Sequence, residues 1–249
     1  MKLAVRSLPL LALFAASLLC FAADKKDKKN AVPANVVDSG SFGIFVKGQR
    51  IATEKFEIAQ QGDGSITRSE LKVDGATKAA QKFELQLSGN GDLRHYAWNE
   101  LSPGKAQATV DPDQNLLVER LVPSPQEKPI EQPFILPTST AILDDYFFSQ
   151  RELLTWRYLG SNCSQTPGGQ VACKLTKSQF GVLIPRQRAS VLVTVEFTGK
   201  ENVTIRGQQV QLNRFNLQGE GMDWAMWFDD AHKLQRVVIA SDFTEVVRD

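Results

Sequence analysis

The sequence predicts a mainly β fold, in which a curved antiparallel sheet shaped like half a barrel wraps on one amphipathic helix. Segments with an apolar residue at every second position recur along most of the chain, as expected of half-buried strands. Turn residues, chiefly Gly, Asn and Asp, separate these segments, which suits antiparallel neighbours. One longer segment has helical spacing instead, and the chain shows no βαβ rhythm and no glycine-rich phosphate loop.

The first 22 residues are typical of a secretory signal peptide. A basic start and an uncharged apolar stretch from Leu8 to Phe21 precede small residues at Cys20 and Ala22. We therefore expect cleavage near Ala22 and a periplasmic or secreted protein. Acylation of Cys20, as in a lipoprotein, is the less favoured alternative because Leu19, which is not a small residue, precedes it.

A charged leader is expected at residues 23–39, because its start, Asp24 to Asn30, alternates Asp with paired Lys and lacks apolar periodicity. A peripheral contact of this run with an anionic membrane surface is an alternative. The rest of the chain, residues 40–249, is expected to form a single β-rich domain.

The first part of this domain alternates strands with turns. The period-2 segments predict strands at 41–46, 50–60, 65–73, 82–87, 93–100 and 116–122. Residues 123–137 then contain five of the eleven prolines. Because proline cannot donate to a strand ladder, we expect an extended surface linker here.

A helix is predicted at about residues 138–159, where apolar residues recur on one helical face. Thr138 or Ser139 is expected to cap it, and Asp144 and Asp145 near its start suit the helix dipole. The apolar face comprises Ile142, Leu143, Tyr146, Phe147, Leu153 and Leu154.

Cys163 and Cys173 enclose a segment that contains the turn residues Pro167, Gly168 and Gly169. Such a turn places the two cysteines opposite each other across a hairpin neck. In an oxidising compartment this arrangement predicts a structural disulfide. Strands then resume, with alternation at 191–197, 203–205, 210–218, 222–228, 234–240 and 243–248.

Composition and charge exclude several classes of function. The chain of 249 residues carries 29 basic and 28 acidic side chains, so no basic excess supports nucleic-acid binding. Three cysteines and two histidines limit metal and nucleophile chemistry, and neither a metal site nor a cofactor is expected. No Gly-x-Ser-x-Gly elbow is present, and we expect no catalytic residue.

Two segments resemble bacterial envelope proteins of uncharacterised domain families that share a curved antiparallel sheet. Gly40 to Glu54 forms a strand, a turn and a strand, and Met222 to Arg236 forms an apolar strand, an acidic turn and a basic-apolar strand. At the level of the fold these families are similar to the periplasmic lipoprotein-carrier half-barrels. The resemblance implies an apolar concavity for an acyl chain or another amphiphile, and it transfers no functional residue.

Aromatic side chains are the candidate ligand-lining residues. Tyr96 and Trp98 share one strand face, whereas Trp224 and Trp227 lie on opposite faces of theirs. Trp98 and Trp227 are both part of a core only where both faces of the sheet are covered, or where one face lines a pocket. The candidate set is Tyr96, Trp98, Tyr146, Phe147, Trp224 and Trp227.

The favoured hypothesis is an exported, monomeric, non-catalytic binding or carrier protein for a lipid or another apolar ligand of the cell envelope. The helix and the proline-rich linker are then a candidate lid. The alternative is an envelope assembly or structural factor that binds a protein partner through a sheet edge. A hydrolase of an envelope polymer, using His95 or a carboxylate pair such as Asp144 and Asp145, is less favoured.

Overall fold

The computed structural model describes residues 35–75, 78–165, 171–174 and 176–249, with the side chains of 165 and 171–173 excepted. These residues belong to one compact unit. The predicted signal peptide and most of the predicted leader lie outside the described residues. The leader was expected to extend to residue 39, but the first strand already begins at Asn35.

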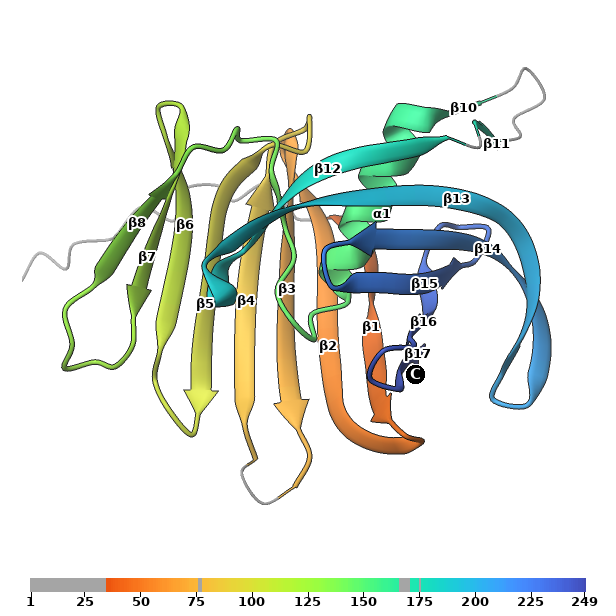
Figure 1. Cartoon of the computed structure of the whole chain (residues 1–249), viewed down its shortest axis with the longest axis horizontal. Helices are drawn as coiled ribbons and strands as arrows, with labels where there is room; N and C mark the ends of the chain where they lie inside the picture. The colour runs from red at the N-terminus through yellow and green to blue at the C-terminus, as the bar shows by residue number, and fades with distance from the viewer. Residues whose placement is uncertain (1–34, 76–77, 166–170, 175) are drawn as a thin grey trace, which may run out of the picture. The chain divides into compact units, whose positions relative to one another are not determined.

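The predicted fold class is confirmed: the described chain is mostly strands in one curved, open sheet, with a single α-helix inside its curve (Figure 1). Fifteen strands follow the order β8-β7-β6-β5-β4-β3-β2-β1-β17-β16-β15-β14-β13-β12-β9. All neighbours are antiparallel except β9 and β12. The right-handed twist of neighbouring strands accumulates over so many strands, and a sheet of this size curls.

The first half of the chain forms a meander of eight strands. They are β1 (Asn35–Val46), β2 (Gln49–Gln61), β3 (Gly64–Val73), β4 (Ala80–Leu87), β5 (Leu93–Ser102), β6 (Gln107–Asp113), β7 (Leu116–Val122) and β8 (Ile130–Phe134). The sequence did not predict β6, in which polar residues and Pro112 obscure the alternation. The proline-rich segment was expected to lack ladder bonds, but its residues 130–134 pair with β7 as an edge strand. An edge tolerates Pro133 because one side of the strand needs no donor.

The second half of the chain completes the sheet around the helix. Its elements are β9 (Ala141–Ile142), α1 (Ser149–Asn162), β10 (Cys163–Gln165), β11 (Val171–Cys173), β12 (Lys177–Ile184), the 3₁₀ turn η1 (Pro185–Gln187), β13 (Ala189–Ile205), β14 (Gln208–Gly219), β15 (Met222–Phe228), β16 (Leu234–Ile239) and β17 (Thr244–Arg248). The first strand of the chain, β1, pairs with the last strand, β17. The two therefore lie side by side in the middle of the sheet. The predicted break between 197 and 203 is only a bulge, so that β13 is one long bent strand.

The helix begins eleven residues later than predicted. Ala141 and Ile142 instead form a short parallel ladder with β12, and Tyr146 adopts a left-handed conformation with φ 61° that a helix does not accept. Thr138 and Ser139 therefore do not cap α1. The face of α1 that contains Leu154, Tyr158 and Leu159 is buried against the inner face of the sheet.

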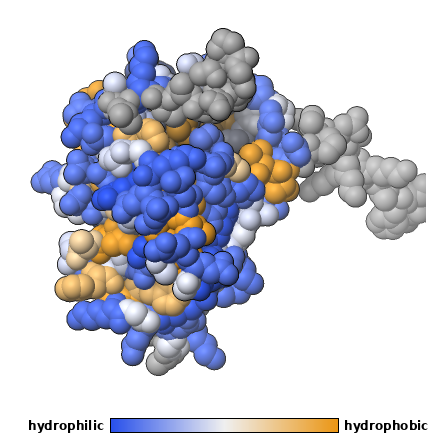
Figure 2. Space-filling model, turned by 90° about the vertical axis from the view of Figure 1, so that its right-hand side faces the viewer, coloured by the Kyte–Doolittle hydropathy of each residue, from blue (hydrophilic) through white to orange (hydrophobic). Residues whose placement is uncertain are grey.

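The inner face of the sheet and the helix share one large hydrophobic core. It draws alternate residues from nearly every strand, as the period of two requires. A second, small core lies on the opposite face and contains Val203, Leu212 and Trp227. The bend of β13 at Gly199 brings the end of the β13–β14 hairpin over this face, where Arg206 donates to the Arg248 carbonyl. Figure 2 faces this side and shows hydrophobic patches between hydrophilic side chains.

Candidate ligand-binding site

A groove of about 670 Å³ lies between α1 and the ends of strands β1 to β4. This volume falls within the range of about 300–1,000 Å³ that small-molecule sites occupy. One wall is a stripe of helix residues at helical spacing, Leu153, Leu154, Arg157, Gly160 and Ser161. The apolar lining comprises Val37, Ile58, Leu85, Leu87, Ala141, Ile142, Leu153, Leu154 and Trp156.

Two tight turns form the rim of the groove. A Cβ on Gly64 would lie 2.2 Å from the Leu87 carbonyl oxygen, and one on Gly89 would lie 2.4 Å from the Asp63 carbonyl oxygen. The β2–β3 and β4–β5 turns thus pack backbone against backbone, and only glycine permits this approach. An exposed ion pair of 2.7 Å also joins Asp63, in the first turn, to Arg94, at the start of β5 directly after the second turn.

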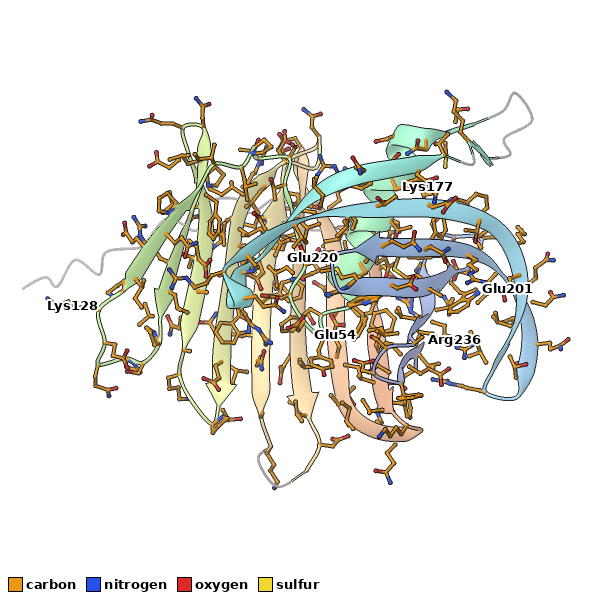
Figure 3. All side chains as sticks on the ribbon, in the orientation of Figure 1. Glu54, Lys128, Lys177, Glu201, Glu220 and Arg236 are labelled. Atoms are coloured by element: carbon orange, nitrogen blue, oxygen red, sulfur yellow. The ribbon has the colours of Figure 1, made fainter. Side chains whose placement is uncertain are left out.

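A buried carboxylate holds the start of α1 against the sheet. Glu54, labelled in Figure 3, accepts bonds from the Phe148 backbone N–H at 2.5 Å and from the Ser149 hydroxyl at 2.6 Å. It also accepts one from the Ser69 hydroxyl at 2.9 Å. Burial raises the pKa of Glu54, and these bonds offset part of that rise. The helix wall of the groove is therefore fixed at its first turn by a side chain from β2.

A second buried polar cluster lies where η1 meets strands β4 to β6. Asp144 accepts from the Tyr96 hydroxyl and from the Arg186 backbone N–H, and Arg186 also donates to Gln81. Arg151, buried in the core, donates to the Asp144 carbonyl. Burial raises the pKa of Asp144, whereas the bond from Tyr96 and the charge of Arg186 lower it. This cluster joins the 141–145 segment and η1 to the inner face of the sheet.

Two further buried carboxyls lie apart from these two clusters. Burial raises the pKa of Glu119, on the inner face of β7, to about 7 although Arg188 lies near. Burial and the neighbouring Asp38 raise the pKa of Glu152, on α1, to about 9. Asp38 itself forms ion pairs with Lys233 and Arg248. Both groups lie in packed interior rather than in the groove.

None of the six predicted ligand-lining aromatic residues lies in the groove lining. Tyr96 and Phe147 both pack against Phe83 in the core, with ring centroids 6.0 and 4.8 Å from it. The guanidinium of Arg186 lies 5.5 Å from the Trp98 ring. Whether any of the six contacts a ligand stays a prediction.

The other three predicted residues are spread over both faces. Trp224 lies on the inner face with the Arg151 guanidinium 4.6 Å from its ring, whereas Tyr146 is 40% exposed. Trp227 is buried in the small outer core, and its Nε1 donates at 3.2 Å to Glu201, labelled in Figure 3 at the β13–β14 hairpin. Of the two alternatives for Trp227, a second covered face or a face that lines a pocket, the structure has a second covered face.

The candidate catalytic residues are dispersed. His95 lies on the outer face of β5, where its Nδ1 is 2.6 Å from Asp111 Oδ1, and it is half-buried. Asp144 points into the core, while Asp145 accepts from Gln187 at the surface. In the described part of the chain no group of three or more His, Cys, Asp or Glu side chains could hold a metal ion.

Sequence reasoning missed the groove residues that matter most. Arg157 was not singled out, although it follows Leu153 at a spacing of four and therefore shares its helix face. The signal that could have found the groove is the combination of this face with the two glycine-rich turns at 62–64 and 89–91. Their convergence depends on strand pairing across the whole meander, which no local pattern shows.

The fold and the groove define a class of β-rich protein whose open, curved sheet wraps on one helix and leaves a cleft beside it. One solved structure is similar, a beta-barrel-like protein of a domain of unknown function, DUF1849, from Brucella abortus. The match has 11% sequence identity and a TM-score of 0.47, and covers 88% of this chain and 95% of that one. A likeness at this level says nothing about what either protein binds.

No protein-family model matches the sequence, and no curated protein matches it. The expected relation to bacterial envelope proteins and to lipoprotein carriers therefore stays a prediction. Within the described residues no helix is long and apolar enough to span a membrane.

Proposed function

We propose that this protein is an exported, non-catalytic binding or carrier protein for a lipid or another apolar ligand of the cell envelope. The observation that carries the proposal is the groove beside α1, with apolar side chains from both the helix and the sheet. Burial of apolar ligand surface there is worth about 25 cal/mol per Å². Export rests on the signal-like first 22 residues.

The groove suits an extended ligand that enters from solvent. Val37, at the start of β1, is 47% exposed while it lines the groove, whereas Ile58 and Leu154 deeper in the lining are 1% and 2% exposed. The apolar surface thus runs from the solvent to the main core. A chain of methylene groups would follow this gradient and replace water along its length.

The test uses Gly160, which lies on the groove side of α1. A Cβ built there meets nothing within 4 Å, so that a larger side chain extends into the groove. We expect Gly160→Phe to weaken binding of an apolar fluorescent probe such as 1-anilinonaphthalene-8-sulfonate at least 10-fold. The matched control, Gly160→Ala, leaves most of the groove open and stabilises the helix by about 0.5–1 kcal/mol.

Lipid extraction of the protein purified from its own host, followed by mass spectrometry, complements this titration. The proposal would be contradicted if native protein carries no lipid and if Gly160→Phe and Gly160→Ala bind the probe equally well. Circular dichroism of both variants establishes that they remain folded.

The alternative, a partner-binding sheet edge, has weaker support. The edge strand β8 has five residues, one of them Pro133, and it offers fewer free donors than a long edge would. Ile130, the first residue of β8, is 43% exposed, and Ile135, directly after β8, is 91% exposed. Crosslinking of an envelope protein to β8, together with an empty groove, would favour this role.

A further inference from the structure

We propose that the groove binds an amphiphile with an anionic oxyacid head, a carboxylate or a phosphate, and that Arg157 binds this head. The inference rests on the proposed function and names the class of ligand. It comes from the charge of the groove lining, in which one arginine has no carboxylate partner.

Arg157 lies on the groove face of α1 and is half-buried. Its Nη1 donates to the Ser139 carbonyl, and its guanidinium lies 5.8 Å from the Phe180 ring. These contacts hold the side chain along the wall of the groove. They leave further N–H donors of a planar fork that matches carboxylate and phosphate oxygens.

The missing counter-ion sets Arg157 apart. Nine of the twelve arginines in the described residues form an ion pair with a carboxylate. The other three are Arg151, Arg157 and Arg188. Arg151 is buried in the core, and Arg188 lies near the buried carboxyl of Glu119. Among the described arginines, only Arg157 combines a location in the groove with the absence of an ion pair to a carboxylate.

The second charged side chain in the groove lining, Asp63, repels a bound anion only weakly, because its own charge is compensated. Asp63 at the rim is held at 2.7 Å by Arg94, which lowers the pKa of the Asp63 carboxyl and compensates its charge. The remaining polar side chains of the lining are uncharged, and they include Gln60, Ser65, Ser88, Asn90 and Ser161. An anionic head beside Arg157 would therefore complete the charge balance of the groove, while the apolar chain follows Leu153, Leu154 and Ile58.

The experiment compares three ligands with one chain length: decanoate, decyl phosphate and 1-decanol. Isothermal titration calorimetry measures their affinities below the concentration at which they aggregate. We expect wild-type protein to bind both anions more tightly than the alcohol. A charge-assisted hydrogen bond contributes about 1.5–3 kcal/mol, which corresponds to roughly 10- to 100-fold in affinity.

Arg157→Gln is expected to weaken binding of decanoate and decyl phosphate at least 10-fold and to leave binding of 1-decanol within twofold. Arg157→Lys keeps the charge and restores part of the loss. Arg120→Gln, at an exposed ion pair on β7, serves as the control and changes none of the three affinities. The ratio of decanoate to decyl phosphate affinity in wild-type protein then identifies the preferred head.

The outcomes separate the two proposals. If wild-type protein binds none of the three ligands, the proposed function fails and this inference fails with it. If it binds all three and Arg157→Gln weakens them equally, the groove binds apolar ligands but the role of Arg157 is overturned. Loss of decanoate affinity with rising salt in wild-type protein, but not in Arg157→Gln, supports the inference.

Discussion

Glu54 shows how a single side chain can determine where a helix begins. The residue before α1, Phe148, provides no side-chain cap, and the backbone N–H groups of Phe148 and Ser149 donate to Glu54 instead. A carboxylate is well suited to this place because it accepts several bonds near the positive end of the helix dipole. Its position in the sequence, 94 residues earlier, explains why no local pattern indicated the cap.

Glu152 makes stability depend on pH. Its pKa is raised to about 9 in the folded state, above the ordinary value of 4.5 for Glu, mainly because burial disfavours the charged form. The folded state therefore binds this proton more tightly than the unfolded state does. The contribution of Glu152 to stability is full below pH 4.5 and is lost as the pH rises toward 9, by on the order of 1 kcal/mol per pH unit.

The first prediction for stability concerns replacement of the Glu152 carboxyl. We expect Glu152→Gln to keep the size of the side chain and to remove the loss of stability that ionisation of Glu152 causes. The variant should therefore be more stable than wild type at pH 8. Urea unfolding between pH 5 and pH 8 measures the difference, which should grow with pH. Glu57→Gln, at an exposed position of β2, is the control. A Glu152→Gln variant with the same pH dependence as wild type would contradict the prediction.

Among the elements, the hairpin β10–β11 follows the expected geometry of the backbone. Cys163 lies opposite Cys173 in the antiparallel register, as the turn residues between them predicted. The disulfide itself stays a prediction, because the side chain of Cys173 lies outside the described residues. The hairpin directly follows the end of α1, and a crosslink here would stabilise the helix terminus as well as the loop.

We expect the protein secreted into an oxidising compartment to contain a Cys163–Cys173 disulfide. Peptide mass spectrometry without reduction should find the two cysteines in one linked species. Cys173→Ser should lower the free energy of unfolding by about 2–3 kcal/mol in the chain-entropy account of a short loop. Full labelling of both thiols by a maleimide in unreduced protein is the result that would refute this.

Strands in which apolar and polar residues clearly alternate could be predicted from the sequence. Strands whose position depends on pairing with a distant strand could not. The segments 65–73 and 82–87 match β3 and β4 within two residues. By contrast β12 was missed because Gly181 and a continuous apolar run, Val182 to Ile184, conceal its period. The helix was placed too early because apolar residues before 149 serve the short β9 ladder and the core instead. Local spacing identifies a face, but not the partner that buries it.

At the scale of the whole molecule, β17 joins the two halves of the sheet. It pairs with β1 on one side and with β16 on the other. We expect removal of residues 244–249 to leave two unpaired edges in the middle of the sheet and to abolish cooperative unfolding. Removal of Asp249 alone leaves the β1–β17 and β16–β17 ladders in place. It deletes ion pairs with Arg50 and Arg206 and hydrogen bonds with Ser41 at the end of the sheet, and each such exposed ion pair contributes about 0–1 kcal/mol.

Far-ultraviolet circular dichroism during urea unfolding measures both truncations. The longer truncation should lose the sharp transition, while the shorter one shifts its midpoint only slightly. Equal midpoints for both truncations would show that the halves hold together without β17. Limited proteolysis provides a second measurement, since newly exposed strands at β1 and β16 are expected to be cleaved first.

The fold class and the single helix could be predicted, because each depends on periodicity along the chain. For the outer face near Trp227, the sequence left two alternatives open. The site could not be predicted. Its walls meet only after β1 to β4 align and α1 docks on them, so that Val37, Leu87 and Arg157 become neighbours from distant parts of the sequence. The six candidates were chosen because they are aromatic, and large aromatic side chains favour the packed core, where Tyr96 and Phe147 are found.

The two outer strands of the sheet, β8 and β9, do not pair with each other. The curve of the sheet is held instead by side-chain and loop contacts from the 138–186 region to the inner strands β4 and β5, among them Arg186 with Gln81 and the Leu93 N–H with the Thr138 carbonyl. A closed barrel can widen its bore only by breaking a strand ladder. This open sheet can change its curvature by loosening those contacts while every strand ladder stays paired.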